Sequence, residues 1–308
     1  MPLERIISDY FTMPNMYGEN GRVFMKELKE YIAIKHGYTE EKLIGVPGFY
    51  RDENGEITFV PRKGIGMKAR NSAGLITGIQ IRNYDYITNK GVLVLSETYK
   101  NGKAKSKYLW VSSGRLKDGC SSEAVVDTII PEVNLDGDLY ITEGKFKAEA
   151  MSRVLGVPVI ALPGVKQWGR VLESEIKYIN ENIKQVNNIF VCFDADLGTN
   201  LDVYGQLKSM TEKVLSKYNA EIKMIVWNQV FGKGLDDLIL ENNKDKYREI
   251  LYTDYIKEYT LFLEELNKRY SIIGDTICYK NTENKADKDE LNELYSQSVL
   301  TPLGVPVR

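Results

Sequence analysis

Between residues 138 and 240, short apolar runs alternate with longer segments in which apolar residues recur every three or four positions. The apolar runs predict strands at 138–142, 157–162, 188–193 and 221–227. The recurring spacing predicts helices over 143–155, along Ile176, Ile179 and Ile183, along Val203, Leu207 and Met210, and from Asp236 onward. Strands that alternate with helices favour a mostly parallel sheet joined by right-handed crossovers.

The region before residue 138 has a different pattern, in which strand-like runs are separated by turn signals such as residues 53–55 (Glu-Asn-Gly). These runs predict strands at 48–51, 57–62, 65–70, 75–82, 92–99 and 108–112. At the two ends of the chain the spacing and the polar character predict helices. We therefore expect a helical N-terminal segment, a basic β-rich subdomain, an α/β domain and a helical C-terminal region, over 1–45, 46–135, 136–242 and 243–308.

Composition narrows the class of protein. Hydrophobic residues make up 43% of the chain, yet none of the apolar runs approaches the roughly 18 residues of a membrane-spanning helix. The N-terminus has no basic segment followed by an apolar one, so we expect no secretory signal, no membrane partner and a cytoplasmic location. Three scattered cysteines and a single histidine argue against a structural zinc site.

Charge is unevenly distributed along the chain. Residues 51–130 contain 13 Lys or Arg and 8 Asp or Glu, a net of +5, whereas residues 131–308 have a net of −6. A basic stretch beside an acidic one suits a phosphate-binding surface next to a cation site, although solvated faces also produce such imbalances.

Acidic motifs follow three predicted elements of the α/β region: Glu143-Gly144, Asp194-Ala195-Asp196, and Gly234-Leu235-Asp236-Asp237. Reactive groups of open α/β sheets lie at the carboxyl ends of the strands, so these carboxylates are expected to converge. Crowded carboxylates repel unless they are neutralised, and their hard oxygens suit Mg²⁺ or Mn²⁺. Asp194 and Asp196 could share a metal ion, with Glu143 across the site. The third ligand is Asp236 or Asp237, and we favour Asp236 because Asp237 could cap a helix.

These motifs resemble those of a known family. Residues 141–148 and 193–196 resemble the Toprim domain shared by DnaG-type primases, topoisomerases and some nucleases. Upstream, residues 67–82 and 107–113 resemble the primase core that precedes Toprim, so that the likeness spans about 48–240. It is closest to primase-like proteins of phages, plasmids and other mobile elements. The sequence lacks the zinc ribbon with which DnaG-type primases usually begin, and its third motif is Gly-Leu-Asp-Asp rather than the Asp-Pro-Asp of cellular primases. It also contains no P-loop motif, so we expect no fused helicase.

The resemblance implies an α/β fold: a Toprim-like parallel-sheet domain, preceded by a mixed α+β basic subdomain and followed by a helical tail. It implies an enzyme, a DNA primase-like nucleotidyltransferase that makes short primers on single-stranded DNA from nucleoside triphosphates, with Mg²⁺ or Mn²⁺ as cofactor. The catalytic residues would be Glu143, Asp194 and Asp196, and the metal ligands would be Glu143, Asp194, Asp196 and Asp236. Contacts to triphosphate or template phosphates would come from Lys68, Arg70, Arg82, Lys107 and Lys145.

Two other functions fit the same motifs. The metal site could activate water, as in a Toprim nuclease that cuts nucleic acid. The chain could also be a non-catalytic module that binds other replication proteins, although such a module need not keep Glu143 together with Asp194 and Asp196. The charged region 243–308 is a candidate docking segment for a partner such as a replicative helicase.

Overall fold

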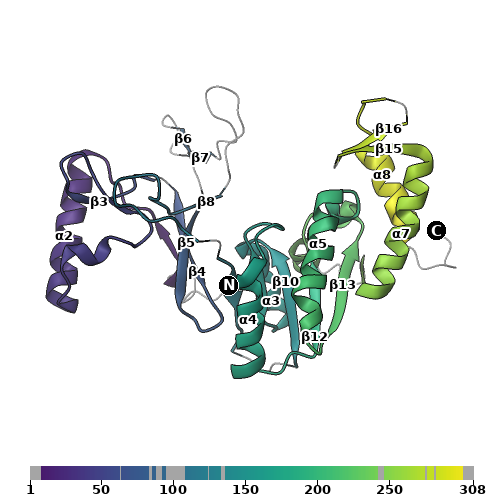
Figure 1. Ribbon diagram of the computed structural model, residues 1–308, viewed down its shortest axis with the longest axis horizontal. Coiled ribbons are helices and arrows are strands. Elements are labelled where there is room, and N and C mark those ends of the chain that lie inside the picture. Colours follow the sequence, from purple (N-terminus) through teal and green to yellow (C-terminus); the bar gives the residue numbers. More distant parts are fainter. Residues whose placement is uncertain are drawn as a thin grey trace. The chain divides into compact units, whose positions relative to one another are not determined.

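The chain folds into two compact units, Met1–Arg70 with Leu75–Val125, and Asn71–Gly74 with Val126–Arg308 (Figure 1). The structure is a computed structural model. It describes residues 8–62, 64–82, 85–87, 92–94, 108–123, 125–132, 136–241, 246–274, 276–280 and 282–300.

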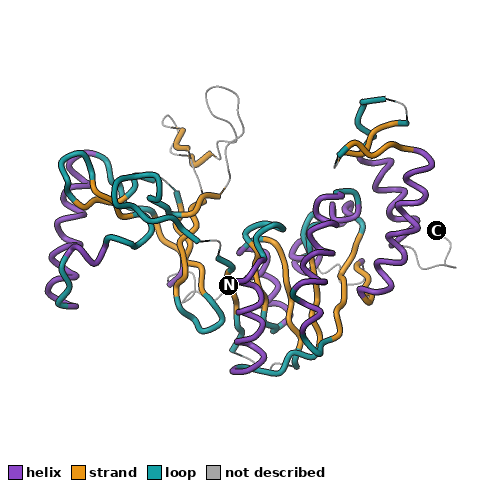
Figure 2. The backbone as a smooth tube through the Cα atoms, viewed as in Figure 1, coloured by secondary structure: helices purple, strands orange, loops and turns teal. Residues whose placement is uncertain are grey.

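The second unit is built on a six-stranded sheet with the order β14-β13-β12-β10-β11-β9. Its strands are β9 (Asp127–Ile129), β10 (Asp138–Glu143), β11 (Val159–Leu162), β12 (Asn188–Cys192), β13 (Glu221–Trp227) and β14 (Tyr247–Leu251). The four central strands run parallel, and the two edge strands are antiparallel to their neighbours. The predicted alternation of strands and helices is therefore confirmed, with a parallel-rich sheet as its result (Figure 2).

Helices cover both faces of this sheet. They are α3 (Lys145–Leu155), α4 (Gly169–Asn182), α5 (Leu201–Lys213), α6 (Leu235–Leu240) and α7 (Tyr252–Arg269). Successive strand residues point to opposite faces, so Leu139 and Ile141 pack with α4, α5 and α7, while Tyr140 packs with α3 and α6. Burial on both faces explains why the central strands are continuous apolar runs.

The order of the central strands changes direction beside β10. The chain passes from β10 through α3 to β11 on one side, and then returns through α4 to β12 on the other side. Such a switch point leaves a crevice at the carboxyl ends of the two strands, which is where ligands bind in open α/β sheets. The acidic motifs after β10 and β12 both lie there.

The region after residue 243 differs from the helical segment expected. The structure adds strand β14, which pairs with β13 in the register Trp227↔Tyr247, because β13 would otherwise leave its edge unpaired. Beyond α7 come β15 (Tyr270–Ile273), β16 (Thr276–Tyr279), α8 (Lys288–Tyr295) and a π-helical turn at Ser296–Leu300. Helix α7 packs through one apolar face, on which Tyr255, Tyr259 and Phe262 are fully buried.

The first unit contains a four-stranded antiparallel sheet with the order β1-β4-β5-β8, a β2–β3 hairpin and a β6–β7 hairpin. Its elements are β1 (Tyr10–Thr12), α2 (Gly18–His36), β2 (Phe49–Arg51), β3 (Ile57–Phe59), β4 (Ile65–Arg70), β5 (Ile76–Arg82), β6 (Asp85–Ile87), β7 (Val92–Val94) and β8 (Tyr108–Trp110). Short 3₁₀ turns occupy Glu40–Leu43 in this unit, and Ala195–Gly198, Leu215–Lys217 and Gln229–Phe231 in the other.

Two details of the first unit differ from the sequence predictions. Residues 10–12 form a strand rather than a helix, because Phe11 packs its ring over Gly66 of β4, where a Cβ atom would lie 2.5 Å from the Phe11 ring. The strand expected at 57–62 ends at Phe59, two residues before Pro61. Of the strand expected at 92–99, the part after Val94 lies outside the described residues.

Within the described part of the chain, the helices lack the combination of length and apolar character that crossing a lipid bilayer requires.

We predict that the interior between α5 and the sheet dominates the stability of the second unit. Leu207→Ala removes a fully buried side chain and is expected to lower the free energy of unfolding by about 2–5 kcal/mol. Leu261→Ala on α7 is the matched control, because Leu261 is 49% exposed, and we expect a change within about 0.5 kcal/mol. Urea denaturation followed by circular dichroism measures both. Equal effects of the two substitutions would contradict the layered core.

Candidate active site

The site begins with two strand ends held side by side. Glu143 is the last residue of β10, and Asp194 follows β12 by two residues. The strands pair in parallel with Thr142 opposite Cys192, and the Thr142 hydroxyl donates a 2.8 Å hydrogen bond to the Cys192 carbonyl. Glu143, expected from the sequence at the start of a helix, instead ends the strand. The reason is Gly144, which adopts a φ of 82° before α3 begins.

A backbone hydrogen bond joins the third acidic motif to the second. The Ala195 N–H donates a 2.9 Å hydrogen bond to the Lys233 carbonyl. Asp237 then caps α6, because its Oδ2 accepts hydrogen bonds from the N–H groups of Lys233 and Gly234 at 2.8 and 3.0 Å. Asp236 does not make this cap. Its Oδ1 is buried and has no hydrogen-bond partner among the described residues.

Two lysines meet at Asp194, which is only 7% exposed. The Lys147 ammonium from α3 pairs with Oδ1, and the Lys233 ammonium lies 3.0 Å from Oδ2. Asp194 raises the pKa of Lys233 by hydrogen bonding and by its charge. These lysines neutralise the carboxylate at the centre of the site.

The carboxyl groups of Glu143 and Asp236 have raised pKa values. Burial, followed by the charge of Asp194, raises the pKa of Glu143 from about 4.5 to about 7, although Lys147 and the Asp194 backbone N–H act in the opposite direction. Burial and the charge of Asp237 raise the pKa of Asp236, again against Lys147. The charge of Asp194 contributes to both shifts, and that of Asp196 contributes to the shift of Glu143. The four predicted acidic residues therefore form one electrostatic cluster.

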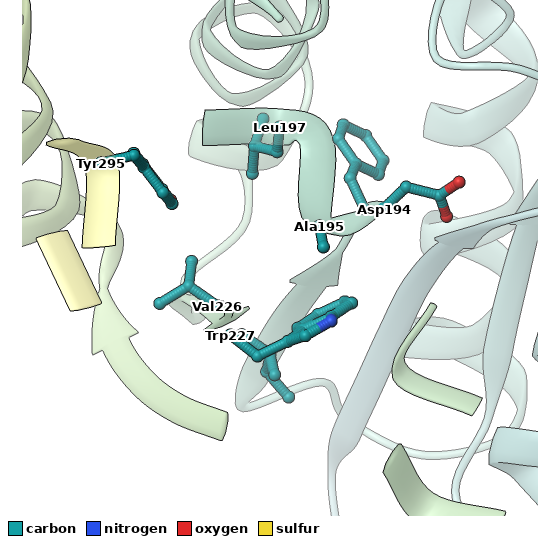
Figure 3. Close-up of a pocket in the computed structure, with 8 residues that line it drawn as sticks. Asp194, Ala195, Leu197, Val226, Trp227 and Tyr295 are labelled. Atoms are coloured by element: carbon teal, nitrogen blue, oxygen red, sulfur yellow. The ribbon is translucent and has the colours of Figure 1, made fainter. Parts of the chain in front are cut away.

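The loop that carries Asp194 and Asp196 rests on side chains from the C-terminal elements. The Tyr259 hydroxyl donates a 3.0 Å hydrogen bond to the Gly198 carbonyl, and any Cβ at Gly198 would overlap the Tyr295 ring. Behind the loop lies a cavity of about 10 Å³, lined by Tyr295 and Trp227 among others. Figure 3 shows the Asp194 carboxylate pointing away from this cavity. The packing holds the loop from behind and leaves its carboxylate facing the site.

The basic residues predicted to contact phosphate have different surroundings. In the first unit, the Lys68 ammonium donates a 2.5 Å hydrogen bond to the Ser8 carbonyl, and the Arg70 Nη2 lies 2.8 Å from the buried Asp9 carboxylate. The Arg82 guanidinium lies 4.7 Å from the centre of the Tyr108 ring. Lys107 lies outside the described residues.

Lys145 lies beneath α3 rather than at its surface. It is 6% exposed, and it pairs with the buried Asp127 and, at 3.6 Å, with Glu149. A phosphate contact by Lys145 stays a prediction, and it would require this side chain to leave two buried carboxylates. The lysines that reach the site are Lys147 and Lys233, which were not among the predicted site residues.

The side chains of this cluster are of the kind that bind a divalent cation, but they do not form a complete coordination site. Within the described ranges, no three His, Cys, Asp or Glu side chains come together closely enough to hold a metal ion. The cluster does offer hard oxygen donors, one of them the orphaned Oδ1 of Asp236. Mg²⁺ typically needs only one or two protein carboxylates besides water and phosphate. The residues therefore fit Mg²⁺ or Mn²⁺, provided that the lysines leave Asp194.

Comparisons with known proteins place the fold. A family model described as "Domain of unknown function (DUF3854)" matches residues 133–246. No curated protein matches the chain. The structure is similar to the RNA polymerase domain of the Mycobacterium tuberculosis primase DnaG, with 13% identity, coverage of 87% of this chain and 76% of that one, and a TM-score of 0.53.

Two further solved structures are similar. One is the same Mycobacterium tuberculosis domain in complex with a double-stranded DNA oligomer with a 6-nucleotide overhang, at 12% identity, coverage of 88% and 74%, and a TM-score of 0.53. The other is the Aquifex aeolicus primase with its zinc-binding and RNA polymerase domains, at 13% identity, coverage of 95% and 63%, and a TM-score of 0.50. At this identity the likeness establishes the fold, which is that of primase RNA polymerase domains.

The raised pKa of Glu143 predicts a pH-dependent effect of Glu143→Gln in metal-free protein. Since the folded state holds this proton more tightly than the unfolded state, stability falls as pH rises from about 4.5 to about 7. Replacing Glu143 by Gln removes this penalty. We expect the substitution to stabilise the protein at pH 8 by about 2–3 kcal/mol more than at pH 5.

Urea denaturation at the two pH values in the presence of a chelator measures this difference. The matched control is Glu264→Gln, an exposed carboxylate on α7 for which no difference between the two pH values is expected. The same effect of Glu143→Gln at both pH values would show that the carboxyl is not held protonated near neutrality.

Proposed function

We propose that this chain is a primase-like nucleotidyltransferase, which joins nucleotides on a single-stranded DNA template, and that residues 136–242 form a Toprim-type domain. One observation carries the proposal. Glu143, Asp194 and Asp236 come from three separate motifs and gather at the switch point of the sheet, in a chain whose fold resembles primase RNA polymerase domains over 87% of its length.

The residues that would hold Mg²⁺ or Mn²⁺ are Glu143, Asp194, Asp196 and Asp236. When bound, the metal ion would neutralise the triphosphate and the charge that develops on the transferred phosphoryl group. The chain itself supplies the partly buried carboxylates that surround the metal position. Asp237 stays out of the ligand set because the backbone of residues 233 and 234 already engages its carboxylate.

Glu143 is suited to take the proton of the attacking hydroxyl. Its pKa of about 7 lies near the operating pH, where a general base is most effective. In the proposed reaction, the 3′-oxygen of one nucleotide bonds to the α-phosphorus of the next, and pyrophosphate leaves. Lys68, Arg70, Arg82 and Lys107 in the basic subdomain 46–135 are proposed to contact the triphosphate and the template phosphates.

The proposed partners are single-stranded DNA, nucleoside triphosphates and, through the region 243–308, a replicative helicase. The DNA partner is supported by the complex of the Mycobacterium tuberculosis domain with a DNA oligomer that carries a single-stranded overhang. A cytoplasmic location and an origin in a phage, plasmid or other mobile element belong to the same proposal.

Primer synthesis tests the proposal directly. Incubation with labelled nucleotides, single-stranded DNA and Mg²⁺ or Mn²⁺ is expected to yield short products. Asp194→Asn should reduce their yield by at least about 100-fold, because the substitution removes the central charge that would hold the metal. The matched control Asp254→Asn, which changes a surface carboxylate of α7 paired with Lys257, should leave the yield unchanged.

Two results would contradict the proposal and select one of its rivals. Metal-dependent cutting of the template, lost in Asp194→Asn, would favour the Toprim nuclease. Absence of both reactions, together with binding of DNA or of a helicase, would favour a non-catalytic module.

A further inference from the structure

Lys147 stands among all three acidic motifs. Its ammonium pairs with Asp194 of the second motif. Its stem packs against the third motif, where a Cβ at Gly234 would lie 3.0 Å from the Lys147 Cε and would overlap the Asp236 carboxylate. Its charge also acts on Glu143 of the first motif and on Asp236. One ammonium thus occupies the centre of the acidic cluster.

Lys233 reinforces this arrangement from the opposite oxygen of Asp194. Each ammonium group pairs with a different oxygen of this carboxylate, Lys147 with Oδ1 and Lys233 with Oδ2. The Asp194 side chain is only 10% exposed, and each of its oxygens already faces an ammonium group. A metal ion that bound these oxygens would therefore compete with the lysines for them.

Lys147 and Lys233 are both less enclosed than Lys145. The side chain of Lys233 is 75% exposed and that of Lys147 is 22% exposed, whereas Lys145 is 4% exposed and fixed between two buried carboxylates. A lysine ammonium on a flexible stem is a compact charge that binds phosphate well. Once displaced from Asp194, Lys147 and Lys233 would be two cations beside the metal.

We propose that Lys147 and Lys233 form an exchangeable phosphate-binding pair. In the metal-free protein they neutralise Asp194, and when a divalent cation takes Asp194 they move to the phosphate oxygens of a triphosphate. The inference rests on the proposed function for the identity of the ligand, a metal-bound triphosphate. It assigns to these lysines a dual role: they weaken the binding of the metal alone and strengthen the binding of the triphosphate.

Calorimetric titration with Mn²⁺ alone, and then with inorganic triphosphate at saturating Mn²⁺, tests both parts. For Lys147→Met we expect Mn²⁺ to bind about tenfold more tightly and triphosphate about tenfold more weakly. For Lys233→Met, which alters an exposed side chain and should not disturb folding, we expect changes in the same directions of about threefold. The matched control Lys208→Met alters a surface lysine of α5 beside Glu212 and should change neither affinity.

Opposite shifts for Mn²⁺ and triphosphate in both variants would support the exchange. Unchanged Mn²⁺ affinity would overturn it, and so would tighter Mn²⁺ binding with unchanged triphosphate affinity. The binding assays need no primer synthesis, so the two proposals can fail separately. Opposite shifts without primer synthesis would contradict the proposed function alone, whereas normal primer synthesis with unchanged affinities would contradict the lysine exchange alone.

Discussion

Repulsion among buried carboxylates is the constraint around which the second unit is organised. Parallel pairing of β10 with β12, in the register Thr142↔Cys192, brings Glu143 and Asp194 together at the carboxyl ends of the two strands. The first turn of α6, which follows β13 along the chain, adds Asp236. Such a cluster is unfavourable unless protons, lysines or a metal ion neutralise it. The structure shows the first two, because the pKa of Glu143 is raised to about 7 and Asp194 is paired with two lysines.

Packing from the C-terminal elements also holds the loop that carries Asp194. The loop after β12 cannot relax away from its neighbours, because Tyr259 and Tyr295 pack against Gly198 from behind and the backbone of Ala195 is bonded to Lys233. Elements at the far end of the sequence thereby hold the acidic loop in place.

Much of the second unit could be predicted from the sequence because its signals are local. Buried parallel strands are apolar runs and their helices have a regular apolar spacing, so β10, β12 and β13 were found almost to the residue. The positions of the acidic motifs at strand ends followed from the same pattern. The edge strands β1, β9 and β14 were not predicted, since they are short and form only by pairing with a neighbouring strand.

The surroundings of Lys145 could be predicted from local sequence, whereas those of Lys147 and Lys233 could not. Helical spacing places Lys145 on the same side of α3 as Glu149, four residues later, and this could have separated it from Lys147. No local signal connects Lys147 or Lys233 with Asp194, because the fold alone brings these residues together. The ligand role of Asp236 likewise depends on the cap that Asp237 makes, which only the three-dimensional arrangement reveals.

The proposed competition between a divalent cation and the Lys147 ammonium for the Asp194 carboxylate is tested most directly by a crystal structure of the protein soaked in Mn²⁺, with an anomalous difference map. We expect an anomalous peak within about 2.3 Å of an Asp194 oxygen, with the Lys147 ammonium moved off that carboxylate. A map with no peak at this carboxylate, and with Lys147 still paired to Asp194 at saturating Mn²⁺, would contradict it.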